Sequence, residues 1–164
     1  MKIYISGPIT GMDNKNWEAF YSMEDSLKSI GYEVVNPLVV SSKLESMIIY
    51  PSWIQYMIVD IRALLDCDAI YHLKGWEESK GAMIEARIAM RIGLKLFFDY
   101  ESVLKYDQRS IISKRYYWIE LLKNMTDDNL GKFINSYDIK IEKLEDPEKS
   151  MNSYIRWCKE LIRG

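Results

Sequence analysis

Short apolar segments alternate with amphipathic segments four times in the first hundred residues. The apolar segments are rich in β-branched and aromatic residues, as strands are, and lie at 2–6, 32–35, 68–73 and 94–98. Because they are mostly apolar along their length, both faces of their sheet must be covered. The alternation therefore predicts an α/β domain with a mostly parallel sheet of four or five strands, right-handed crossovers and helices on both faces.

Three helices are expected between these strands, at about 17–30, 51–65 and 79–92. Asn14 or Asn16 could cap the first of them, and Gly31 stands where a helix commonly ends. The second carries a continuous apolar stripe, which predicts that it packs on the sheet. Residues 38–50 show no clear period and are expected to be mainly loop with a short helical turn.

The composition changes after residue 100. Helices are expected at 110–123, after Thr126, and at 150–162, and the charged segment 142–149 is expected to be exposed. We therefore divide the chain into a domain of residues 1–100 and a helical extension of residues 101–164, which packs on that domain or on a partner subunit.

Charge and rare residue types exclude several classes of function. A net charge of −2 with a pI near 5.5 argues against binding a nucleic acid polymer. No apolar run approaches the ~20 residues of a membrane helix, and Met1 leads directly into a strand, so we expect no membrane partner and no signal peptide. Cys67 and Cys158 are expected to be reduced thiols of a cytoplasmic protein. His72 is the single histidine, so no catalytic metal is expected.

Glu85 lies in the middle of an apolar helical stripe. Its neighbours at i−3, i+3, i+4 and i+7 are Ala82, Ile88, Ala89 and Ile92, and no basic residue stands three or four positions away. An unpaired buried carboxylate is costly, so it normally takes up a proton, finds a distant partner or serves a function. Glu85 is therefore a candidate catalytic residue.

Asp60 also lacks a charged neighbour within its helix. Two carboxylates in unlike environments can divide the roles of nucleophile and acid, as they do in glycoside hydrolysis. A salt bridge to a distant arginine or a capping contact would explain Asp60 equally well.

Two loops that follow strands are candidates for binding substrate. The loop after the first strand has glycines that allow a ligand to approach the backbone, or that simply form a tight turn; it lacks the GK[ST] of a P-loop. Ser79 is expected to cap the helix of Glu85, where free N–H groups can also bind an anion such as phosphate. The candidate binding residues are Gly7, Pro8, Ile9, Thr10, Ser79 and Gly81.

The stretches MKIYISGPITG and MIVDIRALLDCDAIYHLKGWEESKGAMIEARIAMRIG, with their spacing, resemble the nucleoside 2-deoxyribosyltransferase superfamily. Within that superfamily, the chain most resembles the phage and bacterial branch that has the YISGPITG signature. The resemblance covers about residues 1–98. It implies a flavodoxin-like fold, a three-layer sandwich, and cleavage of the N-glycosidic bond of deoxynucleosides or deoxynucleotides without a cofactor. It also implies a homo-oligomer, a dimer or higher, whose sites a neighbouring subunit completes.

The same resemblance assigns roles to single residues. Glu85 matches the nucleophile, Asp60 matches an aspartate that binds the sugar and assists protonation of the leaving base, and Tyr4 matches a tyrosine associated with choosing a 2-deoxy sugar. Six residues before the nucleophile, the transferases have an aspartate for the 5′-hydroxyl and the deoxynucleoside-monophosphate hydrolases have a serine for the 5′-phosphate. Ser79 therefore favours a phosphorylated substrate, which an aspartate would repel.

One position departs from the hydrolases. They carry an arginine for phosphate in the first loop, where this chain has Thr10. Lys15, Lys80 or a basic residue of a second subunit would have to take its place.

The expected function is thus cleavage of 2′-deoxynucleoside 5′-monophosphates with release of the free base. The alternatives are a nucleoside 2-deoxyribosyltransferase, a non-catalytic nucleotide-binding or sensor module on the same fold, and a TIR-like NAD glycohydrolase.

Overall fold

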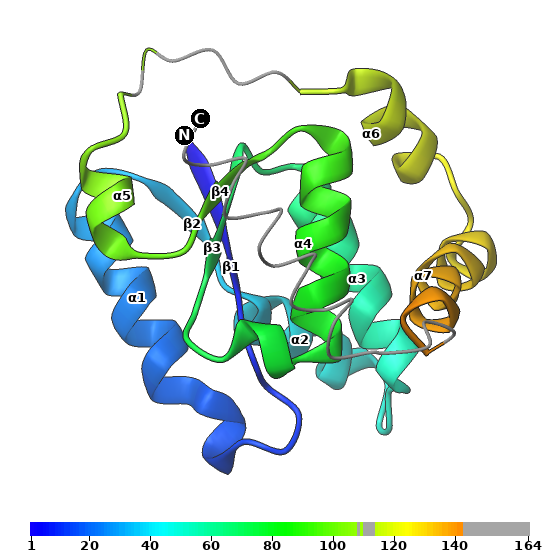
Figure 1. The fold of residues 1–164 in the computed structure, drawn as a ribbon. Coiled ribbons are helices and arrows are strands. Elements are labelled where there is room, and N and C mark those ends of the chain that lie inside the picture. Colours follow the sequence, from blue (N-terminus) through cyan, green and yellow to red (C-terminus); the bar gives the residue numbers. More distant parts are fainter. Residues whose placement is uncertain (108, 110–113, 143–164) are drawn as a thin grey trace.

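In the computed structural model, which describes residues 1–107, 109 and 114–142, the strands form one parallel sheet in the order β2-β1-β3-β4 (Figure 1). The strands are β1 (Lys2–Ser6), β2 (Glu33–Val35), β3 (Ala69–His72) and β4 (Lys95–Phe97). Every pair is parallel, and β1 lies between β2 and β3. This confirms the expected α/β class and is consistent with a flavodoxin-like sandwich.

Helices cover both faces of the sheet (Figure 1). One face packs against α1 (Trp17–Ser29) and α5 (Tyr100–Leu104), and the other against α3 (Trp53–Leu65) and α4 (Lys80–Ile92). Alternation along β1 decides which side chain faces which layer. Ile3 and Ile5 point towards α1, whereas Tyr4 is buried in the layer of α3 and α4.

The expectation of a loop at 38–50 is wrong. A helix, α2 (Pro37–Met47), fills most of this segment and packs beside α3. Asn36 caps it by accepting a hydrogen bond from the N–H of Leu38, at 3.0 Å, and Pro37 occupies the first turn. Only Pro37 of this helix is buried, so the sequence lacks the apolar period that identifies most helices.

The entry to α1 also differs from the expectation. Asn16 precedes the helix in a left-handed conformation (φ 58°), and its side chain does not cap α1. The side-chain amide donates instead to the carbonyl oxygen of Pro8, at 3.1 Å, in the loop after β1. At the other end of α1, Gly31 adopts a φ of +89°, as expected of a glycine that ends a helix.

Beyond the sheet, α6 (Tyr116–Lys123) and α7 (Asp127–Glu142) pack against α3 and α4. Their buried contacts are Ile119, Leu122, Leu130 and Ile134. A helix was expected from residue 110, but residues 114 and 115 are not helical and α6 begins at Tyr116; residues 110–113 lie outside the described residues. Helix α5 was not expected. The expected helix at 150–162, Cys158 and the charged segment after residue 142 lie outside the described residues.

His72 and Cys67 are both buried. His72 is buried at the end of β3, as a strand residue should be. Cys67 is a buried free thiol. None of the helices in the described part of the chain is long and apolar enough to cross a membrane.

Candidate active site

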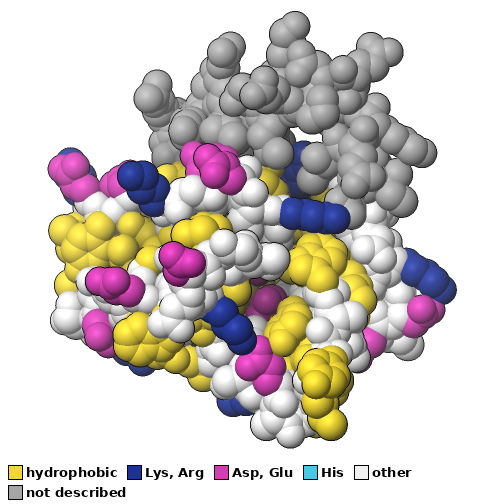
Figure 2. Space-filling model, turned by 90° about the horizontal axis from the view of Figure 1, so that it is seen from below, with side chains coloured by type: hydrophobic (Ala, Val, Ile, Leu, Met, Phe, Trp, Pro, Cys, Tyr) yellow, Lys and Arg dark blue, Asp and Glu magenta, His cyan; other side chains and the backbone are white. Residues whose placement is uncertain are grey.

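A pocket opens at the carboxyl ends of the strands, the edge at which parallel α/β sheets bind ligands. Its cavity measures about 480 Å³, within the range of small-molecule sites. The loop after β1, helices α2 and α3, and the first turns of α4 form its walls. Figure 2 shows the hollow, with apolar side chains around it and acidic side chains at its floor and rim.

Glu85 reaches this pocket from α4. Ser79 caps that helix by accepting a hydrogen bond from the N–H of Ala82, at 3.3 Å, as predicted. The side chain of Glu85 is buried, with 5% of the residue exposed. Its partners come from β1: the hydroxyl of Tyr4 donates to Oε1 at 2.7 Å, and the hydroxyl of Ser6 donates to Oε2 at 2.5 Å. Both carboxylate oxygens are therefore held by hydroxyl donors, with no cation involved in these two bonds.

Burial raises the pKa of Glu85 to about 7, although the hydrogen bonds from Ser6 and Tyr4 act in the opposite direction. Near neutral pH this carboxylate can therefore exchange between its neutral and its charged form. Burial, followed by the charges of Asp60 and Glu85, raises the pKa of Tyr4 well above its ordinary value. Tyr4 consequently stays protonated and remains a donor to Glu85.

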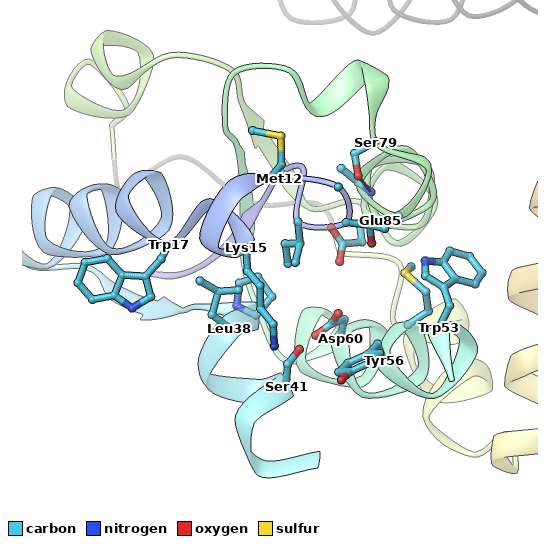
Figure 3. A pocket seen from close by; sticks show the side chains of 18 of the residues that line it. Met12, Lys15, Trp17, Leu38, Ser41, Trp53, Tyr56, Asp60, Ser79 and Glu85 are labelled. Atoms are coloured by element: carbon cyan, nitrogen blue, oxygen red, sulfur yellow. Dashed lines mark hydrogen bonds between the residues drawn. The ribbon is translucent and has the colours of Figure 1, made fainter. Parts of the chain in front are cut away.

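Asp60 faces the same cavity from α3 (Figure 3). Only 6% of it is exposed, and its Oδ1 has no hydrogen-bond partner among the described residues. Burial, and then the charge of Glu85, raise the pKa of Asp60 well above its ordinary value. Among the described residues, Asp60 forms neither a salt bridge nor a capping contact. These two explanations of a buried Asp60 therefore have no support there.

Two buried carboxylates thus share one pocket and compete for ionisation. Each is disfavoured as an anion by burial, and the negative charge of Glu85 further disfavours the anion of Asp60. The hydroxyl groups of Tyr4 and Ser6 favour the charge on Glu85. Near neutral pH the arrangement therefore favours an anionic Glu85 beside a protonated Asp60, which is a nucleophile beside an acid.

Gly7, in the loop after β1, lets that loop pack closely against Leu73. A Cβ placed there would lie 2.9 Å from the Cβ of Leu73, so the missing side chain makes room for Leu73. Ile9 and Thr10 do line the pocket, and Thr10 is exposed. Pro8 is not among the described residues that line it.

The first turn of α4 brings Ser79 and Gly81 to the pocket wall. A Cβ on Gly81 would lie 3.2 Å from Sδ of Met57, so this glycine permits close packing of α4 on α3. The amine of Lys80 lies 4.9 Å from the ring centre of Trp53, another residue of the pocket wall.

Several residues that line the pocket or bind Glu85 were not identified from the sequence. Ser6 follows Tyr4 by two residues, and strand alternation could have placed both on the face of Glu85. Glu45 was missed because α2 was not predicted. Aromatic side chains also line the walls: Trp17, Tyr21, Trp53 and Tyr56. Within the described residues, no three His, Cys, Asp or Glu side chains are grouped so as to hold a metal ion.

Comparison with known proteins gives one match. A protein-family model described as "Domain of unknown function (DUF4406)" matches residues 1–98. This range contains all four strands and every residue that lines the pocket. Neither the curated proteins nor the solved structures contain a match to the chain.

Proposed function

The chain belongs to the DUF4406 family, and from this premise we propose that it cleaves the N-glycosidic bond of 2′-deoxynucleoside 5′-monophosphates and releases the free base. The observation that carries the proposal is the pair of buried carboxylates, Glu85 and Asp60, at one pocket of suitable volume. The resemblance of the sequence to the nucleoside 2-deoxyribosyltransferase superfamily supports the choice of substrate.

In the first step, Glu85 attacks C1′ of the sugar from the face opposite the base. The bond between C1′ and the base nitrogen breaks, its electron pair goes to the base, and Asp60 donates the proton that the leaving base needs. The ionic states favoured near neutral pH, an anionic Glu85 and a protonated Asp60, support this division of roles. The product is a glycosyl-enzyme ester on Glu85.

In the second step, water attacks C1′ and gives its proton to the carboxylate of Asp60. The ester bond breaks and Glu85 leaves as a carboxylate, so both residues return to their starting states. Deoxyribose 5-phosphate is released. If a second base takes the place of water, the same chemistry becomes a transfer.

Tyr4 and Ser6 are the positioning residues of this mechanism. Their hydroxyl groups hold both oxygens of Glu85 and so limit its rotation before the attack. Tyr4 reaches Glu85 from within the sheet layer, so we propose that its influence on the choice of sugar acts through the position of Glu85.

Ser79 and the first turn of α4 are the proposed 5′-phosphate site. The start of a helix presents the positive end of the helix dipole, which favours an anion. In line with the superfamily, we further propose that the protein acts as a homodimer or a higher oligomer.

Transfer between unphosphorylated nucleosides is the second candidate. Thr10, exposed and uncharged, stands where the hydrolases have an arginine. A site with little positive charge would accept a free 5′-hydroxyl.

A substrate screen tests the proposal. Purified protein is incubated with each deoxynucleoside monophosphate, each deoxynucleoside with a second base, and NAD, and free base is followed by chromatography. We expect base release from at least one monophosphate. Base exchange restricted to nucleosides would support the transferase, consumption of NAD would support a glycohydrolase of that cofactor, and tight binding of an uncleaved nucleotide would support a sensor.

A further inference from the structure

Three consecutive residues before α1 have a backbone conformation that side chains disfavour. Asn14, Lys15 and Asn16 have φ angles of 49°, 54° and 58°, and none of them is glycine. The turn is held by hydrogen bonds from the N–H of Lys15 to the carbonyl of Met12, at 3.2 Å, and from Asn16 to Pro8. Strained conformations of this kind persist where the surrounding structure fixes them, often at ligand-binding sites.

The turn places Lys15 across the pocket (Figure 3). Its ammonium group donates to Oε1 of Glu45 on α2 at 2.7 Å, and the hydroxyl of Tyr56 on α3 donates to the same oxygen at 2.9 Å. Three separate walls of the pocket therefore meet at one carboxylate oxygen. We call Lys15, Glu45 and Tyr56 the rim cluster.

Stability does not account for the rim cluster. The side chains of Lys15 and Glu45 are 60% and 35% exposed, and ion pairs at such exposure contribute little to folding. The three left-handed residues that carry Lys15 oppose folding. A binding role explains why the chain keeps this arrangement.

The rim cluster offers an acceptor and a donor side by side. The bond from Lys15, and then that from Tyr56, lower the pKa of Glu45, so its carboxylate is charged at neutral pH. Both bonds end on Oε1, so Oε2 can accept another hydrogen bond without breaking either. The ammonium group of Lys15 has three N–H bonds and can donate to a second acceptor. A planar heterocycle with adjacent N–H and carbonyl or ring-nitrogen groups matches this pair.

The position of the rim cluster fits the base of a nucleotide. Figure 3 shows Ser79 on one side of Glu85 and Asp60, and the side chain of Lys15 with Tyr56 on the other. A nucleotide whose sugar lies at the two carboxylates and whose phosphate lies at Ser79 extends its base towards Lys15. Leu38 and Trp17 line the same end and offer apolar contact to the faces of a ring.

We propose that the rim cluster binds the hydrogen-bonding edge of the leaving nucleobase, with Glu45 and Lys15 as specificity-determining residues. This inference rests on the proposed function. It predicts selectivity for heterocyclic leaving groups over aromatic leaving groups that lack such an edge.

A comparison of two substrates tests the kinetic part. Glu45→Gln and Lys15→Met are assayed with the best deoxynucleoside monophosphate and with para-nitrophenyl 2-deoxyriboside 5-phosphate, whose leaving group has no N–H beside an acceptor. We expect kcat/KM for the nucleotide to fall about 10-fold or more, and that for the nitrophenyl substrate to change by less than about 3-fold. An equal fall for both substrates, or no change for either, would overturn the proposal.

Glu33→Gln is the matched control. Glu33 forms a comparable exposed pair with Lys2, at 2.9 Å, on β2 and β1 away from the pocket. Glu33→Gln should leave kcat/KM unchanged for both substrates. Lys15→Met provides the second variant if Glu45→Gln folds poorly, which thermal unfolding will show.

Binding of free bases separates this inference from the proposed function. Each nucleobase is titrated into Glu85→Gln protein, with and without Glu45→Gln, by calorimetry. One outcome is that the wild type cleaves no substrate, yet a base binds and Glu45→Gln weakens its binding about 10-fold. The proposed role of the rim cluster is then supported and the proposed function fails. If cleavage is present and Glu45→Gln alters neither selectivity nor base binding, the rim cluster fails and the proposed function stands. Absence of both cleavage and base binding overturns both.

Discussion

The hydroxyl of Tyr4 donates a 2.7 Å hydrogen bond to Oε1 of Glu85, joining the middle of β1 to a helix 81 residues later in the chain. This bond lies between two buried groups and links the sheet to the candidate nucleophile. Ser6, on the same face of β1, holds the other oxygen. The carboxylate is thus fixed by β1, a central strand that is buried from Ile3 to Ser6.

The pH dependence of activity should report the ionisation of Glu85. With a pKa of about 7, Glu85 is protonated as the pH falls below 7, and kcat/KM should drop about tenfold per pH unit there. Because the bond from Tyr4 lowers this pKa, Tyr4→Phe should shift the acid limb to higher pH and reduce the maximal rate. Initial rates between pH 5 and 9 provide the measurement. An acid limb that stays in place in both Tyr4→Phe and Ser6→Ala would contradict the assignment.

Removing the charge of Glu85 should stabilise the fold at high pH. Its pKa is raised from 4.5 to about 7 on folding, so the folded state binds the proton more tightly, and stability is lost as the pH rises from 4.5 through 7. This difference corresponds to roughly 3 kcal/mol above pH 7. Glu85→Gln should therefore unfold at higher urea concentration than the wild type at pH 8, and the advantage should disappear at pH 4.

Glu24 provides the control for that experiment. It is another buried glutamate, but its oxygens are paired with Lys28 and Asn36. Glu24→Gln should lower stability at pH 8. A Glu85→Gln protein that is as destabilised at pH 8 as Glu24→Gln would show that Glu85 serves the fold.

Ser79→Asp should reverse the preference for a phosphate. Aspartate caps a helix as well as serine does, so the fold should be retained. Its charge repels a phosphate at the start of α4, and kcat/KM for monophosphates should fall about 10- to 100-fold, while that for unphosphorylated nucleosides should not. Ser52→Asp, at the corresponding position of α3, is the control. Equal effects on both substrate classes would remove Ser79 from the phosphate site.

Gly7→Ala should destabilise the protein because the new Cβ meets Leu73 at 2.9 Å. Overpacking of this kind costs about 1–3 kcal/mol, measurable by urea unfolding. The double variant with Leu73→Gly should lose less stability than the sum of the two single changes, because it removes the Cβ that the new side chain meets. Should the single variant unfold like the wild type, the packing role of Gly7 would be wrong.

Local periodicity in the sequence is enough to predict most of the fold and to identify the two carboxylates as unusual. Glu85 and Asp60 stand out because their helical neighbours cannot pair with them, and the structure leaves both buried at one pocket. The partners of Glu85 come from β1, and only strand alternation hints at Ser6. Helix α2 was missed because only Pro37 of it is buried. The left-handed turn at Lys15 was missed because it contains no glycine, so Glu45 and its pairing could not be predicted.

The central claim, that Glu85 performs nucleophilic attack, is tested most directly by the rate of base release in two matched variants. Glu85→Gln and Glu24→Gln each replace one buried glutamate by its isosteric amide, and free base is quantified from the best monophosphate. We predict a loss of at least about 1,000-fold for Glu85→Gln, because the amide cannot form the glycosyl-enzyme ester, and less than about 3-fold for Glu24→Gln. Base release by Glu85→Gln at the wild-type rate would contradict the mechanism.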